Sequence, residues 1–464
     1  MAPSLGDLGI TAITANIPRP NQAFWTLSAL WAGWLWGREA VGPFKSVLRR
    51  QRYDWAWHTA ALTSALGSMS EHTPEGTSFF GLIGEAEPGF LTSSILAASS
   101  AGFFLDGVAL RQDSGYAQIS WHKGSKAPSL RTESEAALRS SISGASKLLQ
   151  NTGQPCEYLT LHAAALMAMA EDNALQLVST SDRGSMPQEG TEPKPAQNFQ
   201  QVHSVLKDTF MYRSGFLRVD GKEQLSESGY WWLRDVEESL HTQRTSPLFD
   251  RIEVEVVRLL LKNSDFSLSE TDTAVCKSFP GLLTPEKSLV TTCLDSYGEQ
   301  DQKSPGRWKL REQDLPKARR KDLGMAREIL QKLGERLGYQ VETRSKGGEA
   351  ARPGSTPTFW QASGEVEFVF YILASAAISE PVFASEFQTV KHGLIILPGS
   401  RSNLVDYKLR NDPLLRQEVL KRWKFIKYRH LRQLAGNPVL TRENFLEQVD
   451  LDPVTYSAPQ MRML

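Results

Sequence analysis

Near the N-terminus, the stretch Asn16–Arg19 (Asn-Ile-Pro-Arg) directly follows a short predicted strand over residues 9–15. Open α/β sheets bind their ligands at the carboxyl ends of their strands, so this stretch stands where a ligand is expected. Asn16 offers a side-chain oxygen that can accept a hydrogen bond, and the backbone carbonyls beside it offer further acceptors. Pro18 and Pro20 stop the strand because proline cannot donate to a ladder.

Other reactive residue types lack partners at useful spacing. His58, His162 and His430 each stand alone on a predicted helix, and no Gly-x-Ser-x-Gly or Cys/His signature is present. The chain has three widely separated cysteines, which are Cys156, Cys276 and Cys293. They form no disulfide framework or zinc site, so we predict no metal centre and expect a reducing, cytoplasmic compartment.

The first 123 residues alternate between strand and helix patterns. The predicted elements after the first strand are a helix over 53–69, a strand over 77–83, a helix over 88–100, and strands over 102–110 and 116–121. The turn between the last two strands is short enough for a hairpin. This order predicts half of an open α/β sheet that ends on an antiparallel edge.

The most hydrophobic stretch covers residues 23–36 (AFWTLSALWAGWLW). Its 14 residues fall short of the roughly 20 that span a bilayer, and its flanks differ from those of a signal peptide. We therefore predict a buried helix and no membrane contact. Six of the twelve tryptophans lie between residues 25 and 57, namely Trp25, Trp31, Trp34, Trp36, Trp55 and Trp57, and a tryptophan-rich core or partner interface is favoured over a base-stacking platform.

Together, the Asn-Ile-Pro-Arg stretch and the elements after it resemble the catalytic half of amino-group DNA methyltransferases, which modify N6 of adenine or N4 of cytosine. Their signature is an Asp, Asn or Ser, then Pro-Pro, then an aromatic residue at the end of a strand. Asn16 matches the acceptor position and Pro18 the second proline. The resemblance implies a partial Rossmann-like lobe in which Asn16 accepts hydrogen bonds from the amine of a flipped base.

Two positions depart from this signature. Ile17 replaces the first proline, and Arg19 replaces the aromatic residue that stacks on the base. The stacking face would then have to come from Phe24 or Trp25 in the following helix.

The cofactor half of such a fold has no counterpart in the sequence. S-adenosylmethionine requires a glycine-rich loop after a strand, and only 15 residues precede Asn16. Neither residues 279–281 (Phe-Pro-Gly) nor residues 397–400 (Leu-Pro-Gly-Ser) suit that loop. We therefore expect another chain to supply this half. Whole chains of this kind are similar to the C-terminal part of large DNA methylases from bacterial defence loci.

An internal repeat marks the middle of the chain. Residues 229–235 (GYWWLRD) and 306–312 (GRWKLRE) share a W-x-L-R core, and helices precede each copy. Helices that end in a strand carrying Trp and Arg are typical of a winged helix, although a plain helical connector with a hairpin remains an alternative. We assign residues 135–312 to this region, with a polar linker over 181–198.

The remaining part, residues 313–464, is predicted to be a small α/β domain. It contains a helix over 314–337, strands over 339–342, 366–373 and 393–397, and a helix over 416–434. A restriction-endonuclease-like fold would use Glu342, Glu365 or Glu367 to hold Mg²⁺. The expected Asp and Glu-x-Lys pattern is absent, so surface carboxylates are favoured over a degenerate nuclease.

The net charge is zero, with 52 basic and 52 acidic residues, which excludes a uniformly basic nucleic-acid coat. The C-terminal domain nevertheless carries clustered cations. The predicted DNA-binding residues are Lys421, Arg422, Lys424, Lys427, Arg429, Arg432, Arg319 and Arg320. Basic residues next to aromatic ones suit a phosphate backbone, and DNA contact is favoured over the alternative of solvated faces that pair with neighbouring acids.

These observations predict three domains, over residues 1–123, 135–312 and 313–464. The expected function is that of a DNA-binding component of a methyltransferase, with double-stranded DNA and a protein partner that carries the cofactor half. The alternative is a non-catalytic DNA-binding or scaffold subunit of a bacterial defence or restriction–modification complex.

Overall fold

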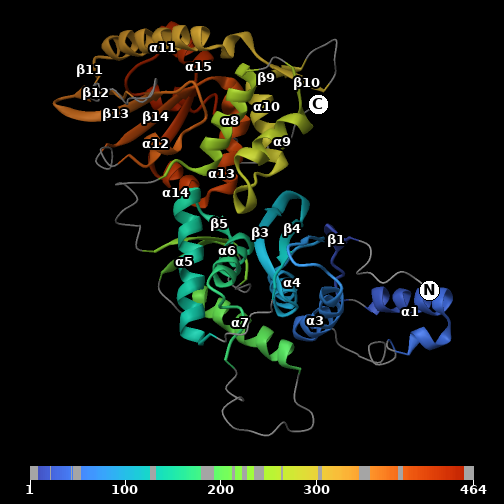
Figure 1. Ribbon diagram of the computed structural model, residues 1–464. Coiled ribbons are helices and arrows are strands. Elements are labelled where there is room, and N and C mark those ends of the chain that lie inside the picture. The colour runs from blue at the N-terminus through green and yellow to red at the C-terminus, as the bar shows by residue number, and fades with distance from the viewer. Residues whose placement is uncertain are drawn as a thin grey trace. The chain divides into compact units, whose positions relative to one another are not determined.

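The structure is a computed structural model. It describes residues 9–20, 22–42, 44, 54–125, 132–178, 193–211, 215–221, 227–234, 245–262, 265–300, 306–343, 356–384 and 390–453. The fold is mixed α/β with several small sheets, as predicted (Figure 1).

The chain divides into two units. Unit 1 comprises Met1–Leu149, Cys156–Arg234 and Pro280–Thr284, and unit 2 comprises Gln150–Pro155, Asp235–Phe279 and Pro285–Leu464. Unit 1 thus joins the predicted sheet lobe to the first W-x-L-R copy, while unit 2 joins the second copy to the C-terminal α/β region.

Unit 1 contains a four-stranded sheet of order β1-β2-β4-β3 (Figure 1). Its strands are β1 (Ala12–Asn16), β2 (Ser78–Ile83), β3 (Phe103–Arg111) and β4 (Tyr116–Lys123). β1 and β2 are parallel, whereas β4 is antiparallel to both of its neighbours. The short turn Gln112–Ser114 joins β3 to β4, so the predicted hairpin is confirmed.

Helices cover one face of this sheet. α3 (Trp55–Glu71) and α4 (Pro88–Ser100) pack against each other, and α4 is buried along almost its whole length. On the same side, the rings of Phe79 and Trp121 stack with centroids 4.8 Å apart. On the opposite face Phe80 and Leu82 are 39% and 44% exposed. Parallel strands are normally covered on both faces, yet the described residues leave this second face open.

The tryptophan-rich helix α1 (Gln22–Trp36) forms as predicted, but the prediction that it is buried was wrong. Six large apolar side chains are more than half exposed, namely Leu27, Leu30, Trp31, Trp34, Leu35 and Trp36. The helix packs its small residues against the turn Arg38–Val41, and a Cβ on Gly33 would approach the Val41 side chain to 2.8 Å. Because α1 is apolar on all sides and only the narrow face of small residues is covered, most of its apolar surface remains exposed.

Each W-x-L-R copy ends a group of the same element order: helix, short strand, helix, helix, hairpin. In unit 1 the elements are α5 (Ser134–Thr152), β5 (Cys156–Glu157), α6 (Tyr158–Glu171), α7 (Lys194–Met211), β6 (Phe216–Asp220) and β7 (Tyr230–Leu233). In unit 2 they are α8 (Leu248–Lys262), β8 (Phe266–Ser267), α9 (Leu268–Ser278), α10 (Lys287–Tyr297), β9 (Gly298–Gln300) and β10 (Arg307–Leu310). The sheet orders are β5-β7-β6 and β8-β10-β9, so the W-x-L-R strand is central in both. Trp231 and Trp308 are buried at equivalent places.

The C-terminal part of unit 2 is a five-stranded mixed sheet. Its strands, in spatial order, are β11 (Gln340–Thr343), β12 (Thr358–Ala362), β13 (Glu365–Ile372), β14 (His392–Leu397) and β15 (Trp423–Lys427). β11 to β13 form an antiparallel meander, and β14 and β15 continue in parallel. The helices are α11 (Pro316–Arg336), α12 (Ser379–Val382), α13 (Ser402–Asn411), α14 (Pro413–Arg422), α15 (Tyr428–Gly436) and α16 (Phe445–Val449).

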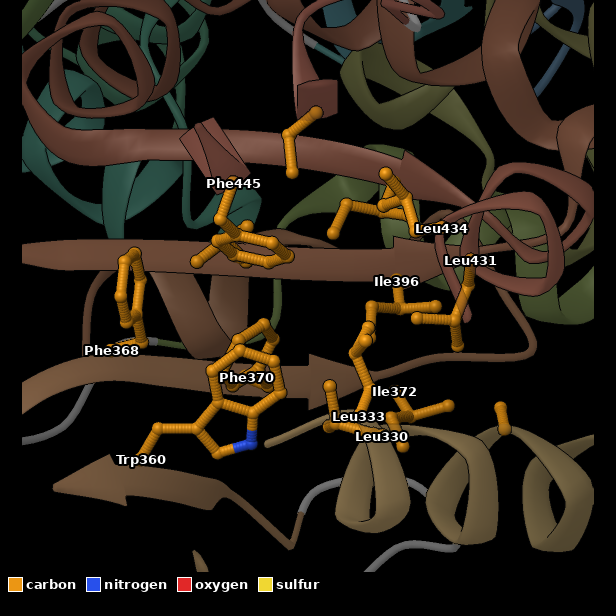
Figure 2. Packing of buried hydrophobic residues seen from close by; sticks show 14 of the residues in the cluster. Leu330, Leu333, Trp360, Phe368, Phe370, Ile372, Ile396, Leu431, Leu434 and Phe445 are labelled. Atoms are coloured by element: carbon orange, nitrogen blue, oxygen red, sulfur yellow. The ribbon is translucent and has the colours of Figure 1, made fainter. Parts of the chain in front are cut away.

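Aromatic side chains fill the core of this sheet (Figure 2). The Trp360 ring centroid lies 4.4 Å from that of Phe370 and 5.3 Å from that of Phe445. α11 approaches this ring at Gly334, where a Cβ would come within 2.6 Å of the indole. The glycine therefore lets the helix contact the sheet closely.

The predicted helix over residues 416–434 was wrong in its middle. α14 ends at Arg422, β15 follows, and α15 begins at Tyr428. The alternation of Trp423, Lys424, Phe425 and Ile426 suits a strand, and the Trp423 ring covers Gly393 of the adjacent β14. A run of basic residues concealed this alternation.

Buried ion pairs join the helical group of unit 2 to its sheet. Lys408 Nζ lies 2.6 Å from Asp250 Oδ1 and 2.5 Å from Glu253 Oε2. Burial opposes a charge on this lysine, but the two carboxylates outweigh burial and raise its pKa. Nearby, the fully buried Arg401 pairs with Asp314. Breaking one such buried pair typically costs about 3–5 kcal/mol because a charge is left uncompensated.

Candidate functional site

Asn16 is the last residue of β1, and its side chain is exposed. It is paired in register with Leu82 of the parallel strand β2. An open pocket of about 420 Å³ lies here, lined by Thr14, Ala15, Asn16, Phe80, Gly81, Leu82 and Gln118. The predicted acceptor therefore borders a pocket at the carboxyl end of two parallel strands, where ligands of open α/β sheets bind.

The residues after Asn16 are held against β2. The backbone N–H of Ile17 donates to the Leu82 carbonyl at 2.9 Å, and the Ile17 side chain is buried. A Cβ on Gly81 would lie 2.8 Å from Ile17 Cδ1, so glycine at this position leaves room for that side chain. The position of Asn16 is therefore set by backbone pairing on one strand and by packing of the next residue.

Arg19 is bound by two carboxylates. Its guanidinium lies 2.6 Å from Glu85 Oε2 and also pairs with Glu87. Both glutamates follow β2, so they belong to the same sheet edge as Asn16. The guanidinium also lies 5.9 Å from the centroid of the Trp55 ring. The position where the methyltransferase signature has an aromatic residue is thus occupied by a paired cation beside an aromatic ring.

The predicted stacking residues do not present a free ring here. The Trp25 ring packs edge-on against Trp57 at 5.9 Å and lies 6.4 Å from Phe44. The Phe24 side chain lies outside the described residues. Trp55 is partly exposed, stacks on Phe90 at 5.1 Å and is the aromatic residue next to Arg19. From the sequence, Trp55 was identified only as one of the clustered tryptophans and not as a neighbour of Arg19. Glu85 and Glu87 were not identified, although both follow a predicted strand.

His58 lies buried below the site. Burial lowers its pKa to about 4, while the Pro18 carbonyl nearby favours the protonated ring and only partly opposes this shift. Neither ring nitrogen forms a hydrogen bond of normal geometry with a described residue. Burial likewise lowers the pKa of His162, in the same unit, to about 3. Both rings are therefore neutral in the folded protein at neutral pH.

Most of the predicted DNA-binding cations have acidic partners, some nearby in sequence and others in distant segments. Lys424 lies 2.6 Å from Asp450, and Lys427 and Arg429 lie 2.6 and 3.0 Å from Asp452. The remaining pairs are Lys421 and Arg422 with Glu418, Arg432 with Asp322, and Arg319 with Asp314 and Asp322. Lys427 and Arg319 are almost fully buried, whereas Arg320, Lys421, Arg429 and Arg432 are exposed.

The third helix of each W-x-L-R group packs within the protein. In helix-turn-helix proteins a recognition helix lies in the DNA groove. Here α7 packs against α3 and α4, and α10 packs against α13. Arg311 of the second W-x-L-R copy donates to the carbonyls of Ser296 and Asp295 at the end of α10. Both repeats therefore use their tryptophan and third helix for internal packing.

The glutamates of the nuclease alternative are dispersed. Glu342 accepts a hydrogen bond from Gln361 at 3.0 Å, and Glu367 pairs with Arg442 at 2.5 Å. Among the described residues, no group of three or more His, Cys, Asp or Glu side chains could hold a metal ion.

The loop over residues 397–400 connects β14 to α13, so it has the strand-to-helix setting that a cofactor loop needs. The adjacent Arg401 is fully buried, and the Lys427 side chain lies 3.7 Å from the position of a Cβ on Gly399, an ordinary contact. The loop contains a single glycine, unlike the glycine-rich loops that bind S-adenosylmethionine.

The low pKa of His58 predicts acid sensitivity of unit 1. Below pH 6.5 the unfolded histidine takes up a proton that the folded one takes up only near pH 4, so stability falls over this window. We expect His58→Asn to reduce this loss by roughly 3 kcal/mol. The measurement is hydrogen exchange of α4 peptides in denaturant between pH 7 and pH 4. His72→Asn, at the exposed end of α3, is the control; parallel profiles for both variants would contradict the assignment.

Within the part of the chain that the structure covers, no helix is long and apolar enough to cross a membrane. Comparison of the chain with protein-family models, with curated proteins and with solved structures gives no significant match. The functional interpretation therefore depends on the geometry around Asn16 and on the topology of its sheet.

Proposed function

We propose that unit 1 contributes the target-base half of an amino-group DNA methyltransferase, and that another protein chain supplies the S-adenosylmethionine-binding half. The observation that carries this proposal is the order of the sheet. β1, carrying Asn16 at its carboxyl end, is followed by the helices α1 and α3, the parallel strand β2, the helix α4 and the antiparallel hairpin β3–β4. The resemblance of the Asn-Ile-Pro-Arg stretch implies the same order.

In this proposal the Asn16 side chain accepts a hydrogen bond from the exocyclic amine of a flipped adenine or cytosine. The pocket beside it is open and has exposed Phe80 and Leu82 in its wall, which suits the apolar faces of a base. Phe80 replaces Phe24 and Trp25 as the candidate for stacking, because its ring is exposed in the pocket wall, whereas Trp55 beside Arg19 already stacks on Phe90. The ion pairs of Arg19 hold this loop against the end of β2.

The cofactor half is assigned to another chain because the sequence offers no convincing glycine-rich loop between a strand and a helix. The two W-x-L-R groups, which have the element order of winged helices, and the C-terminal sheet then serve as the frame of the complex. For the C-terminal sheet we propose no nuclease role, since its strands lack the Asp and Glu-x-Lys pattern; an inactive restriction-endonuclease-like domain is the alternative. Such a complex would act in restriction–modification or antiviral defence.

The proposal predicts that methyl transfer depends on Asn16. The complex purified from its natural host should transfer tritiated methyl groups from S-adenosylmethionine to unmethylated duplex DNA. Asn16→Ala should lower this rate by about 100-fold or more, as expected when a preorganised hydrogen bond to the reacting group is removed. Asn403→Ala, at an exposed asparagine in unit 2, is the matched control and should leave the rate unchanged. Equal rates in both variants would remove the proposal.

A second candidate is a DNA-binding subunit without catalysis. It is favoured by Arg19, which takes the place of the stacking aromatic residue and is already paired with two carboxylates. In this case the exposed cations of the C-terminal sheet region, rather than Asn16, would determine DNA affinity.

Salt dependence tests this second candidate. Each phosphate contact adds about one unit to the slope of log affinity against log salt concentration. Lys424→Ala combined with Arg429→Ala should reduce the slope for a random-sequence duplex by about two. Lys262→Ala combined with Arg410→Ala removes two exposed cations outside the cluster and should not change it. An unchanged slope in the first variant would exclude these residues as phosphate contacts.

A further inference from the structure

The exposed side chains of α1 follow the spacing of a docking helix. Leu27, Leu30, Trp31 and Trp34 occupy positions i, i+3, i+4 and i+7, so they lie on one face of the helix. Their exposed fractions are 56%, 64%, 53% and 79%. This is the pattern of anchors with which an amphipathic helix binds an apolar groove.

The apolar surface on α1 is large enough for a stable interface. Leu35 extends the face at 62% exposure, whereas Trp36 lies on the opposite side of the helix. With about 150–250 Å² for each side chain, the five residues of the face present on the order of 500–800 Å². The largest apolar patch on a typical monomer is about 300–600 Å², whereas one side of a standard protein interface buries about 800 Å². The area therefore approaches one half of a standard protein–protein interface.

The chemistry of α1 indicates a protein as its partner. No charged residue occurs between Gln22 and Trp36. Binding to a nucleic acid requires cations, and a helix that lies on a membrane surface carries lysine or arginine on its polar face. Tryptophan side chains, by contrast, are enriched among the residues that contribute most to protein interfaces.

The first strand of the same unit indicates what kind of protein this is. Within the described residues β1 pairs with β2 alone, and four of its five residues are exposed. A second copy related by a two-fold axis would place its own β1 antiparallel to this edge. A strand that continues the parallel arrangement of β1 and β2 therefore cannot be the β1 of such a copy, and we expect it to come from a different chain.

We propose that the α1 face formed by Leu27, Leu30, Trp31 and Trp34 docks into an apolar groove of the protein that carries the S-adenosylmethionine-binding half, and that a strand of this protein adds to β1. The inference rests on the proposed function and locates its interface. It assigns α1, which has no role at the base pocket, to holding the two halves together.

Photo-crosslinking in the natural host tests this interface. The full chain carries p-benzoylphenylalanine in place of Leu30, and a control chain carries it in place of Leu420, which is 78% exposed in unit 2. We expect the Leu30 position to crosslink to one protein, identified by mass spectrometry, which binds S-adenosylmethionine when purified. Crosslinks to a second copy of this chain, to lipid, or to a protein that does not bind S-adenosylmethionine would overturn the proposal, as would the absence of a crosslink.

Negative charges placed on α1 test the docking proposal independently of the proposed function. Leu30→Glu combined with Trp34→Glu changes two exposed positions, so thermal unfolding should remain within the range of surface substitutions. This variant should lose the partner and at least 90% of the methyl transfer. Methyl transfer that survives would overturn the docking proposal and leave the proposed function intact. A complex that forms through α1 and binds S-adenosylmethionine without methylating DNA would support the docking and overturn the function.

Discussion

The backbone of β1 imposes the constraint from which the account of this protein follows. Peptide groups at a strand edge need partners, and parallel strands are normally covered on both faces. β1 satisfies one edge through β2, while its side chains and the adjoining face with Phe80 and Leu82 remain exposed among the described residues. The same edge carries Asn16 at its carboxyl end. The need of the sheet for a further strand and the location of the candidate base pocket therefore coincide on one strand.

The charges at the candidate sites are largely paired within the described part of the chain, which directs attention from electrostatics to apolar docking. Arg19 is paired with carboxylates that follow β2, and Lys408 is buried between Asp250 and Glu253. In the C-terminal region Asp452 forms ion pairs with both Lys427 and Arg429. The apolar face of α1 has no such internal partner of comparable area among the described residues. If DNA is the substrate, its recognition depends more on the assembled complex than on a basic surface of this chain.

Local patterns predicted the first sheet well. α4 begins and ends at the predicted residues, and β2, β3 and β4 lie within one or two residues of their predicted bounds, because each element is apolar and ends at glycine or proline. Long-range partners could not be predicted. The region around Trp423 looked like a basic helix because Asp450 and Asp452 are distant in sequence. The exposure of α1 was missed because hydrophobicity alone cannot tell a core helix from a docking helix. At the site, Asn16 was identified by its position after a strand, whereas the place of Trp55 beside Arg19 had no signal in the sequence.

The central claim, that Asn16 faces a target base, is tested most directly by crosslinking from this position to DNA. The complex is purified with p-benzoylphenylalanine in place of Asn16, mixed with a random-sequence duplex and irradiated, and the crosslinked nucleotide is sequenced. The account predicts crosslinks concentrated on adenine or cytosine, and none from the same group placed at Asn403. Crosslinks spread evenly over all four nucleotides, or no crosslink from position 16 in a complex that binds DNA, would contradict it.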